Sequence, residues 1–200
     1  MEELDPFARD VLVQLKRETL LKAATEFFNS SGYDGTSLDE IVASLGLTKG
    51  AFYYYIENKE DLLYQCYLRS LEVTERTVRN IAASPVSGLE KIQRYIFGMV
   101  FAHAGPEGPV AIYSRVRSLS AKRQALVVQR GKAVQAQVTA FIEEGVVDGS
   151  IRPCDPKLAR LAVVGALNWM PKWHARTGPK GPGTVAAAFA DFFVNGLAAD

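Results

Sequence analysis

TSLDEIVASLGLTKGAFYYYIENKEDLL, which spans residues 36–63, is the stretch of sequence that decides the fold. Ser37 and Glu40 have the S-x-x-E spacing of a capping box, which satisfies free backbone amides at the start of a helix. Four apolar residues then recur with the i, i+3, i+4, i+7 spacing of one helical face, namely Leu38, Ile41, Val42 and Leu45. Gly46 suits the left-handed conformation that commonly ends a helix. This half of the stretch therefore predicts a short amphipathic helix followed by a tight turn.

The residues after the turn predict two more helices. Thr48 is placed to cap a helix that runs to about Tyr55, and Asn58 is placed to cap a third helix. The core positions of the third helix include Leu62, Leu63 and Cys66. Two short helices joined by a tight turn form a helix-turn-helix, the element that places a helix in the major groove of DNA.

The same region follows the pattern G-Y-x-x-T-S-x-x-x-I-x-x-x-x-G-x-x-K-G-x-x-Y-Y-x-x-x-x-K-E-D-L-L. The residues that carry the pattern are Gly32, Tyr33, Thr36, Ser37, Ile41, Gly46, Lys49, Gly50, Tyr53, Tyr54, Lys59, Glu60, Asp61, Leu62 and Leu63. This pattern resembles the DNA-binding domain of TetR-family transcriptional regulators, and the resemblance begins at about residue 20. One departure is Ile56, where the family usually has Phe. Because both residues are apolar, we expect Ile56 to pack in the core.

Two kinds of DNA contact are expected within the motif. Hydroxyl and ammonium groups suit phosphate oxygens and set the register of the protein on DNA. The residues to which we assign phosphate contacts are Thr36, Ser37, Thr48, Tyr53, Tyr55 and Lys59. By resemblance, the positions that reach base edges are Lys49, Gly50, Ala51 and Tyr54. Successive helical residues point about 100° apart, so at least one of the three adjacent tyrosines must face outward.

Composition indicates a globular protein of the cytoplasm. No apolar run in the 200 residues reaches the ~18 residues that span a bilayer, and the acidic N-terminus does not resemble a secretory signal. Cys66 and Cys154 lie too far apart to indicate a disulfide framework. Residues 1–60 hold six basic and eleven acidic side chains, so charge alone argues against nucleic-acid binding. The motif outweighs this balance, which predicts weak non-specific DNA affinity and a modest salt dependence.

Hydrophobic periodicity predicts an all-α fold of about nine helices. By resemblance, residues 1–60 form a three-helix DNA-binding domain, and residues 61–200 form a helical domain for effector binding and dimerisation. Asp5-Pro6 and Asp155-Pro156 both have the N-cap and first-turn proline of a helix start, while glycine and proline mark the loops. The expected helices after the motif cover residues 59–82, 88–103, 110–119, 121–144, 156–175 and 184–198.

The last two expected helices are rich in alanine and glycine, which permit close approach between helices. In TetR-family regulators these helices pair with their copies across a two-fold axis. The resemblance therefore implies a homodimer that binds double-stranded DNA at an inverted-repeat operator. Pro171 departs from the pattern, because proline removes a helix hydrogen bond and should kink or end its helix.

The resemblance also implies a pocket for a small-molecule effector. Its candidate lining residues are Phe97, Phe101, His103, Tyr113, Asn168, Trp169 and Trp173, for each of which core packing is the alternative. Residues 110–140 hold six cations and no carboxylate, which form either a solvated basic face or an anion site with Arg115, Arg123 and Arg130 as its candidate contacts. SLSAKRQALVVQRGKA and GALNW-x-x-x-W together resemble the family branch that controls lipid, sterol and acyl catabolism. The effectors of that branch are often acyl-coenzyme A thioesters.

These features favour a transcriptional repressor that an effector releases from DNA. An enzyme is disfavoured, because the sequence has no H-E-x-x-H, G-x-S-x-G, P-loop or dinucleotide-binding motif. His103 and His174 are too few and too far apart in sequence to predict a metal site, and no cofactor is expected. Two alternatives remain, namely a regulator that responds to a purely apolar or aromatic compound such as a drug, and a DNA-binding protein that needs no effector.

Overall fold

The computed structural model describes residues 6–105, 108–111, 113–174 and 178–199. For residues 6–10 and 113–115 it describes the backbone alone. The regular secondary structure of the described residues is helical. In chain order the helices are α1 (Pro6–Gly35), α2 (Leu38–Ser44), α3 (Lys49–Tyr53), α4 (Lys59–Ala82), α5 (Gly88–Ala104), the 3-10 helix η1 (Tyr113–Ser118), α6 (Ala121–Asp148), α7 (Pro156–Trp169), the 3-10 helix η2 (Met170–Lys172) and α8 (Pro182–Leu197). The all-α prediction is confirmed. In place of about nine helices, these residues form eight α-helices and two 3-10 helices.

Local capping contacts define the helix-turn-helix as the sequence predicted. The Ser37 hydroxyl accepts a hydrogen bond from the backbone amide two residues later at 3.2 Å, and the Glu40 carboxylate accepts one from the Ser37 amide at 3.3 Å. Gly46 has a φ of 61°, in the left-handed region that glycine tolerates. Thr48 and Asn58 cap α3 and α4 through side-chain oxygens that accept backbone amides. The turn between α2 and α3 is therefore fixed by contacts close in sequence.

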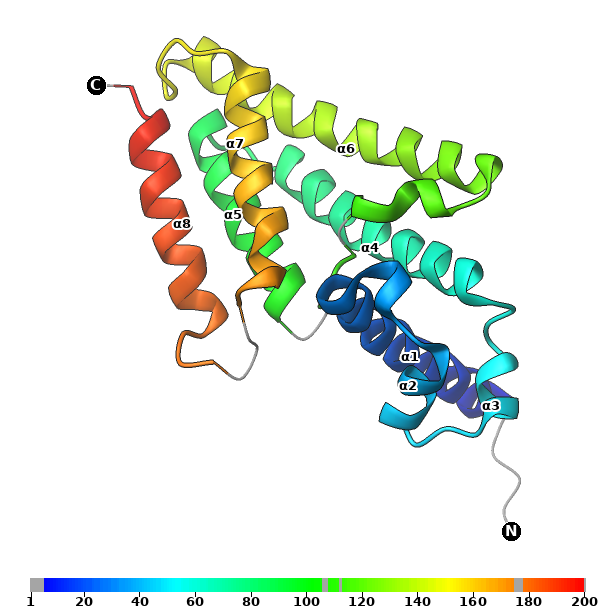
Figure 1. Ribbon diagram of the computed structural model, residues 1–200. Coiled ribbons are helices and arrows are strands. Elements are labelled where there is room, and N and C mark those ends of the chain that lie inside the picture. Colours follow the sequence, from blue (N-terminus) through cyan, green and yellow to red (C-terminus); the bar gives the residue numbers. More distant parts are fainter. Residues whose placement is uncertain (1–5, 106–107, 112, 175–177, 200) are drawn as a thin grey trace.

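Two apolar clusters form the core, and α4 contributes to both of them. The first packs α1, α2 and α3 against the N-terminal half of α4 and includes Phe52, Ile56 and Cys66. Ile56 is buried as expected, and burial raises the pKa of the Cys66 thiol to about 12, so that this cysteine is an inert core residue. The second cluster joins the C-terminal half of α4 to α5, α6, α7 and α8. Figure 1 shows α1–α3 grouped at one end of the molecule and α8 at the other.

The expected end of the long helix near Gly145 is wrong by one turn. α6 continues to Asp148, and the left-handed residue that follows it is Gly149, with a φ of 78°. Gly145 has a different purpose, because a Cβ atom at Gly88 would lie 2.1 Å from the Gly145 backbone nitrogen. Glycine at position 88 allows the start of α5 to pack directly against the end of α6, while a Cβ atom at Gly145 would lie 2.5 Å from the Ile151 side chain.

The predicted effect of Pro171 is confirmed, and it shortens the helix expected over residues 156–175. α7 ends at Trp169, and the 3-10 helix that follows contains Pro171. The helix expected over residues 110–119 is likewise a short 3-10 helix, η1. Within the described residues, none of the helices carries an apolar stretch that is long enough to cross a bilayer.

Candidate DNA-binding surface and effector cavity

The recognition helix α3 presents its polar side chains to solvent. Tyr53 and Tyr54 are 52% and 75% exposed, whereas Phe52 on the same helix packs into the core and is fully buried. Gly50 and Ala51 are also exposed, and no atom lies within 4 Å of a Cβ built on Gly50. Four residues assigned to DNA from the sequence are therefore accessible, and Tyr53 and Tyr54 face outward, in agreement with the expectation that at least one of the three tyrosines does.

Lys49 at the start of α3 is paired with a carboxylate from α2. Its ammonium lies 2.9 Å from one Asp39 oxygen and donates to the other at 3.1 Å. This hydrogen bond raises the pKa of Lys49, which stays protonated and exposed. The sequence alone did not reveal this pair, because the two residues lie on different helices. A base contact through Lys49 therefore requires its ammonium to leave Asp39.

The hydroxyls assigned to phosphate contacts divide into two groups. Ser37 and Thr48 are exposed, and each accepts a backbone amide as a cap while keeping a hydroxyl hydrogen to donate. Thr36 is different, because it is only 3% exposed and its hydroxyl donates to the Gly32 carbonyl at 2.6 Å. Thr36 is therefore the least accessible of the hydroxyls assigned to phosphate, since its donor is used within the α1–α2 connection.

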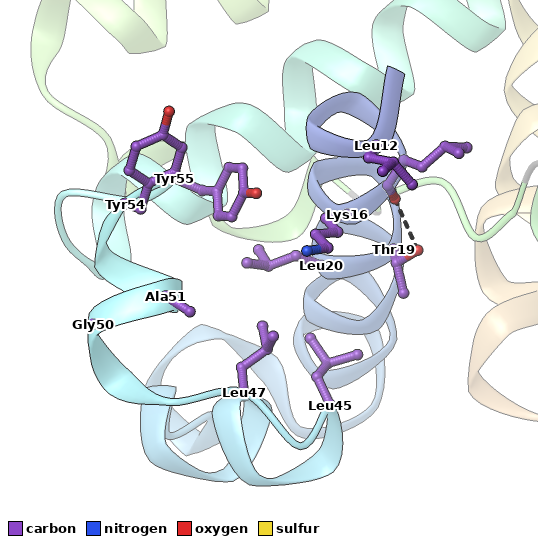
Figure 2. Close-up of a pocket in the computed structure, with 11 residues that line it drawn as sticks. Leu12, Lys16, Thr19, Leu20, Leu45, Leu47, Gly50, Ala51, Tyr54 and Tyr55 are labelled. Atoms are coloured by element: carbon purple, nitrogen blue, oxygen red, sulfur yellow. Dashed lines mark hydrogen bonds between the residues drawn. The ribbon is translucent and has the colours of Figure 1, made fainter. Parts of the chain in front are cut away.

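Tyr55 and Lys59 lie at the edge of the surface. Tyr55 is half-buried and packs against the first apolar cluster. The Lys59 ammonium lies 4.7 Å from the centre of the Tyr33 ring, a cation–π arrangement that orients its side chain. A hollow of about 600 Å³ lies between α3 and α1, and its lining includes Tyr55, Leu12, Lys16, Gly50 and Ala51. Figure 2 shows these side chains around the hollow.

A second cavity, of about 320 Å³, opens between α4, α5, α6 and α7. Most of its wall is apolar, with hydroxyl, amide and ammonium groups at separate points. The lining residues are Ser70, Leu71, Thr74, Tyr95, Met99, Val110, Ala111, Val116, Val127, Val128, Gly131, Lys132, Val134, Gln135, Val164 and Asn168. Burial raises the pKa of the Tyr95 phenol well above its usual range, so Tyr95 offers a neutral hydroxyl to this cavity. We name this space the effector cavity.

Of the residues expected to line an effector pocket, Asn168 lies in the wall of this cavity. Phe97 packs against the second apolar cluster, and Phe101, Trp169 and Trp173 are 44%, 64% and 49% exposed. His103 lines a different pocket. The side chains of Tyr113 and Arg115 lie outside the described residues. The sequence analysis proposed mostly aromatic lining residues, but the cavity wall is mainly aliphatic and comes from several elements, with Val127, Val128 and Val134 on α6.

Arg123 and Arg130, two of the candidate contacts of an anion site, are paired with carboxylates from outside the basic segment. Arg123 contacts Asp61 at 2.9 Å and Glu60 at 3.5 Å, and Arg130 forms two hydrogen bonds of 2.8 Å with Glu75. All three carboxylates come from α4, which packs beside α6. These arginines therefore hold α6 to α4, and the cation that lines the effector cavity is Lys132, which the sequence analysis did not select.

A short segment connects the wall of the effector cavity to the DNA-binding helices. Asn29 on α1 donates to the Val110 carbonyl at 2.9 Å. The Ala111 amide donates to the Ser70 hydroxyl on α4 at 2.7 Å, and Arg69 donates to the Pro109 carbonyl at 3.0 Å. Residues 109–111 are thus fixed to α1 and α4 at the same time.

The exposed sides of α7 and α8 are unusually apolar for a surface. Leu158, Leu161 and Trp169 on α7 and Phe192 on α8 are 63%, 49%, 64% and 75% exposed. The small residues Ala162 and Gly165 lie between them on α7 and are also exposed. Contiguous exposed apolar residues of this kind mark interaction surfaces.

Comparison with known proteins relates this geometry to a family. The family model described as "Tetracyclin repressor-like, C-terminal domain" matches residues 85–197, and the one described as "Bacterial regulatory proteins, tetR family" matches residues 20–66. The transcriptional repressor KstR2 of Mycolicibacterium smegmatis is 25% identical over 186 residues, which cover 91% of this chain and 90% of KstR2.

Solved structures agree with the fold. The ketosteroid transcriptional regulator KstR2 of Mycobacterium tuberculosis superposes with a TM-score of 0.80 at 21% identity, over 92% of this chain and 96% of that one. AibR, in complex with isovaleryl coenzyme A and operator DNA, superposes with a TM-score of 0.71 at 22% identity, over 88% and 96%. The chain therefore belongs to the TetR family and is a DNA-binding transcriptional regulator, in agreement with the prediction that it is not an enzyme.

Proposed function

We propose that this protein is a repressor that binds an inverted-repeat operator as a homodimer and leaves it when a small-molecule effector fills the effector cavity. The observation that carries the proposal is the segment of residues 109–111. Val110 and Ala111 line the cavity, and Val110 is hydrogen-bonded to Asn29 on α1. An effector that displaces this segment shifts α1, and with it the packing of the recognition helix, because α1 and α3 share one apolar cluster.

The apolar sides of α7 and α8 support dimerisation through these helices. The exposed residues of α7 after Lys157 are leucine, alanine, glycine and tryptophan, so a second copy can cover this face without burying a charge from it. Two copies place two recognition helices on one DNA molecule, which doubles the number of bases that are read.

For the effector we propose an acyl-coenzyme A thioester. The cavity volume of about 320 Å³ lies at the lower end of the range of about 300–1,000 Å³ for ligand pockets, so the acyl part fits inside and the larger coenzyme A part remains outside. Aliphatic walls suit an acyl chain, and Lys132 supplies a cation at the cavity for the phosphates or the carbonyl. The AibR structure, which contains isovaleryl coenzyme A, is consistent with this class, whereas the name of KstR2 concerns ketosteroids, which are apolar compounds without a thioester.

The experiment is a release titration on DNA. Fluorescence anisotropy would follow the protein bound to an operator selected from random DNA, while acyl-coenzyme A thioesters of increasing chain length, and the matching free acids, are added. We expect the thioesters to release the DNA at concentrations at least tenfold lower than the free acids. Lys132→Met should reduce sensitivity to the thioester, whereas Lys122→Met, an exposed change on the same helix that does not line the cavity, should leave it unchanged.

The same titration decides the main alternative. The apolar character of the cavity also suits a purely apolar or aromatic compound. Equal potency of thioester and free acid, with no effect of Lys132→Met, would assign the effector to that class. A complete lack of release by any ligand that raises the thermal unfolding midpoint would contradict effector control itself.

A further inference from the structure

The pocket between α1, α5 and η2 contains an unusual concentration of unpaired polar atoms. Among the side chains that the structure describes, the buried nitrogen and oxygen atoms without a hydrogen-bond partner are Nδ1 and Nε2 of His103 and Nε2 of His174. Both histidines line this one pocket of about 280 Å³, although 71 positions separate them in the sequence. Buried polar groups are nearly always hydrogen-bonded, so three orphan nitrogens on two residues that line one pocket point to a missing partner.

His103 is the defining residue of this pocket. It is 4% exposed, and burial lowers the pKa of its imidazole to about 4, so it is neutral at physiological pH. A neutral imidazole offers one N–H donor and one acceptor nitrogen, and neither is used by a described residue of the protein. A partner for this ring must therefore both accept and donate a hydrogen bond.

The charged groups at the rim do not call for a charged ligand. The Lys172 ammonium donates to the Asn29 carbonyl at 2.5 Å, and the Glu26 carboxylate, which lines the pocket, already has an interaction within the protein. An anion would meet the Glu26 carboxylate, and the Lys172 ammonium, bonded to the carbonyl of the lining residue Asn29, would oppose a cation. Pro109, Met170 and Pro171 supply an apolar wall opposite these polar groups.

A metal ion fits less well than an organic molecule. Among the described residues, no three His, Cys, Asp or Glu side chains are grouped closely enough to hold a metal. Two imidazoles alone leave a transition metal short of the protein ligands that stable sites use.

We propose that this pocket is a second binding site, distinct from the effector cavity, that takes a small uncharged molecule with an amide group and a flat apolar body. The amide carbonyl and amide N–H pair with the two imidazoles, and the apolar body lies against Pro109 and Met170. The site spans the two halves of the protein, because Glu26 and Asn29 belong to α1 while His103 and Met170 belong to α5 and η2. A bound molecule therefore ties the DNA-binding helices to the C-terminal helices.

Nicotinamide is a suitable probe, and the full-length protein with ¹⁵N-labelled histidine is the sample. We expect millimolar nicotinamide to shift the ring nitrogen signals of both His103 and His174 in two-dimensional NMR spectra. We also expect the unfolding midpoint to rise by about 3 °C when the probe is tenfold above its Kd. Neither readout uses DNA or acyl-coenzyme A, so the result is independent of the proposed function.

Three variants complete the test. His103→Leu should abolish the response, and the half-buried His174→Gln, which is less disruptive to folding, should weaken it at least fivefold. Asn168→Leu, placed in the effector cavity, is the matched control and should respond like the wild type. Unchanged histidine signals with nicotinamide, or a response that survives both histidine changes, would overturn the proposal. A response to zinc chloride but not to nicotinamide would replace it with a metal site.

Discussion

Tyr54 on the recognition helix is 75% exposed, whereas Tyr95 in the effector cavity is 4% exposed. The first tyrosine contributes almost nothing to the core and is free to contact another molecule. The second is buried in the wall of the effector cavity, so a change of its side chain also alters contacts that stabilise the fold. The comparison teaches that the DNA-binding surface can be altered without loss of stability, whereas the interior sites cannot be altered without some change in the free energy of unfolding.

The largest expected effect tests whether exposed residues far from α3 also control DNA binding. Leu161→Glu combined with Phe192→Glu places two charges on the apolar face of α7 and α8. We expect a folded monomer whose DNA affinity is about a hundredfold or more below that of the wild type, because each molecule then reads one half-site. Sedimentation and fluorescence anisotropy would measure both changes.

Leu126→Glu is the matched control, because Leu126 is 39% exposed on α6 and lies outside α7 and α8. It should leave the dimer and the DNA affinity unchanged. A double variant that remains dimeric would move the interface to another surface.

The second prediction concerns a buried group, for which the comparison requires a change in stability. Burial lowers the pKa of His103 from its ordinary value to about 4, so the unfolded chain binds one more proton between about pH 6.5 and pH 4. Stability from the neutral ring is therefore present above pH 6.5 and is lost as the pH falls. We expect His103 to account for a loss of about 3 kcal/mol between pH 7 and pH 4.

Urea unfolding at several pH values would measure this loss, and His103→Leu gives the reference slope. Glu26, His174 and Lys172 near the pocket are present in both proteins, so their contribution cancels in the difference. Parallel pH profiles for the wild type and the variant would contradict the assignment.

The third prediction concerns Tyr54, which the comparison treats as a surface residue. Tyr54→Ala should weaken binding to the preferred operator by about 1–3 kcal/mol and relax the preference at particular bases. The unfolding midpoint should stay close to that of the wild type. A uniform loss of affinity for all DNA sequences would instead indicate a phosphate contact.

The smallest expected effect comes from the ion pair between Asp39 and Lys49. Both side chains are about two-thirds exposed, so the pair adds little to stability. Asp39→Asn frees the Lys49 ammonium for DNA and removes one negative charge, so we expect DNA affinity to rise about threefold and to become more sensitive to salt. Lys49→Ala in the same background should remove the gain. A fall in affinity for Asp39→Asn would show that Asp39 positions Lys49 instead of competing for it.

The sequence predicted features that depend on neighbours close along the chain. Ser37, Gly46 and Asn58 adopt their expected capping positions, because each cap bonds to a backbone group within a few residues. The helix over residues 59–82 was predicted to the residue for the same reason, with an asparagine cap at one end and proline shortly after the other.

Features that depend on distant neighbours were not predictable. Arg123 appeared unpaired because its partner Asp61 lies 62 residues away on α4. Gly145 appeared to end a helix because its close approach to Gly88 is a contact between helices. The effector cavity draws residues from four helices, so Lys132 and Ser70 gave no local signal of their position.

One substitution tests most directly whether the effector cavity controls DNA binding. Gly131 lines the cavity, and a Cβ atom there would meet no atom within 4 Å, so Gly131→Leu fills the cavity without a backbone clash. Gly131→Ala is the matched control, because it makes the same gain in helix propensity but leaves most of the space open. The measurement is the concentration of acyl-coenzyme A that releases half of the protein from its operator. The account predicts that both variants bind DNA with an affinity within about threefold of the wild type. It also predicts that the half-release concentration is at least tenfold higher for Gly131→Leu alone. Equal half-release concentrations in all three proteins would contradict the account.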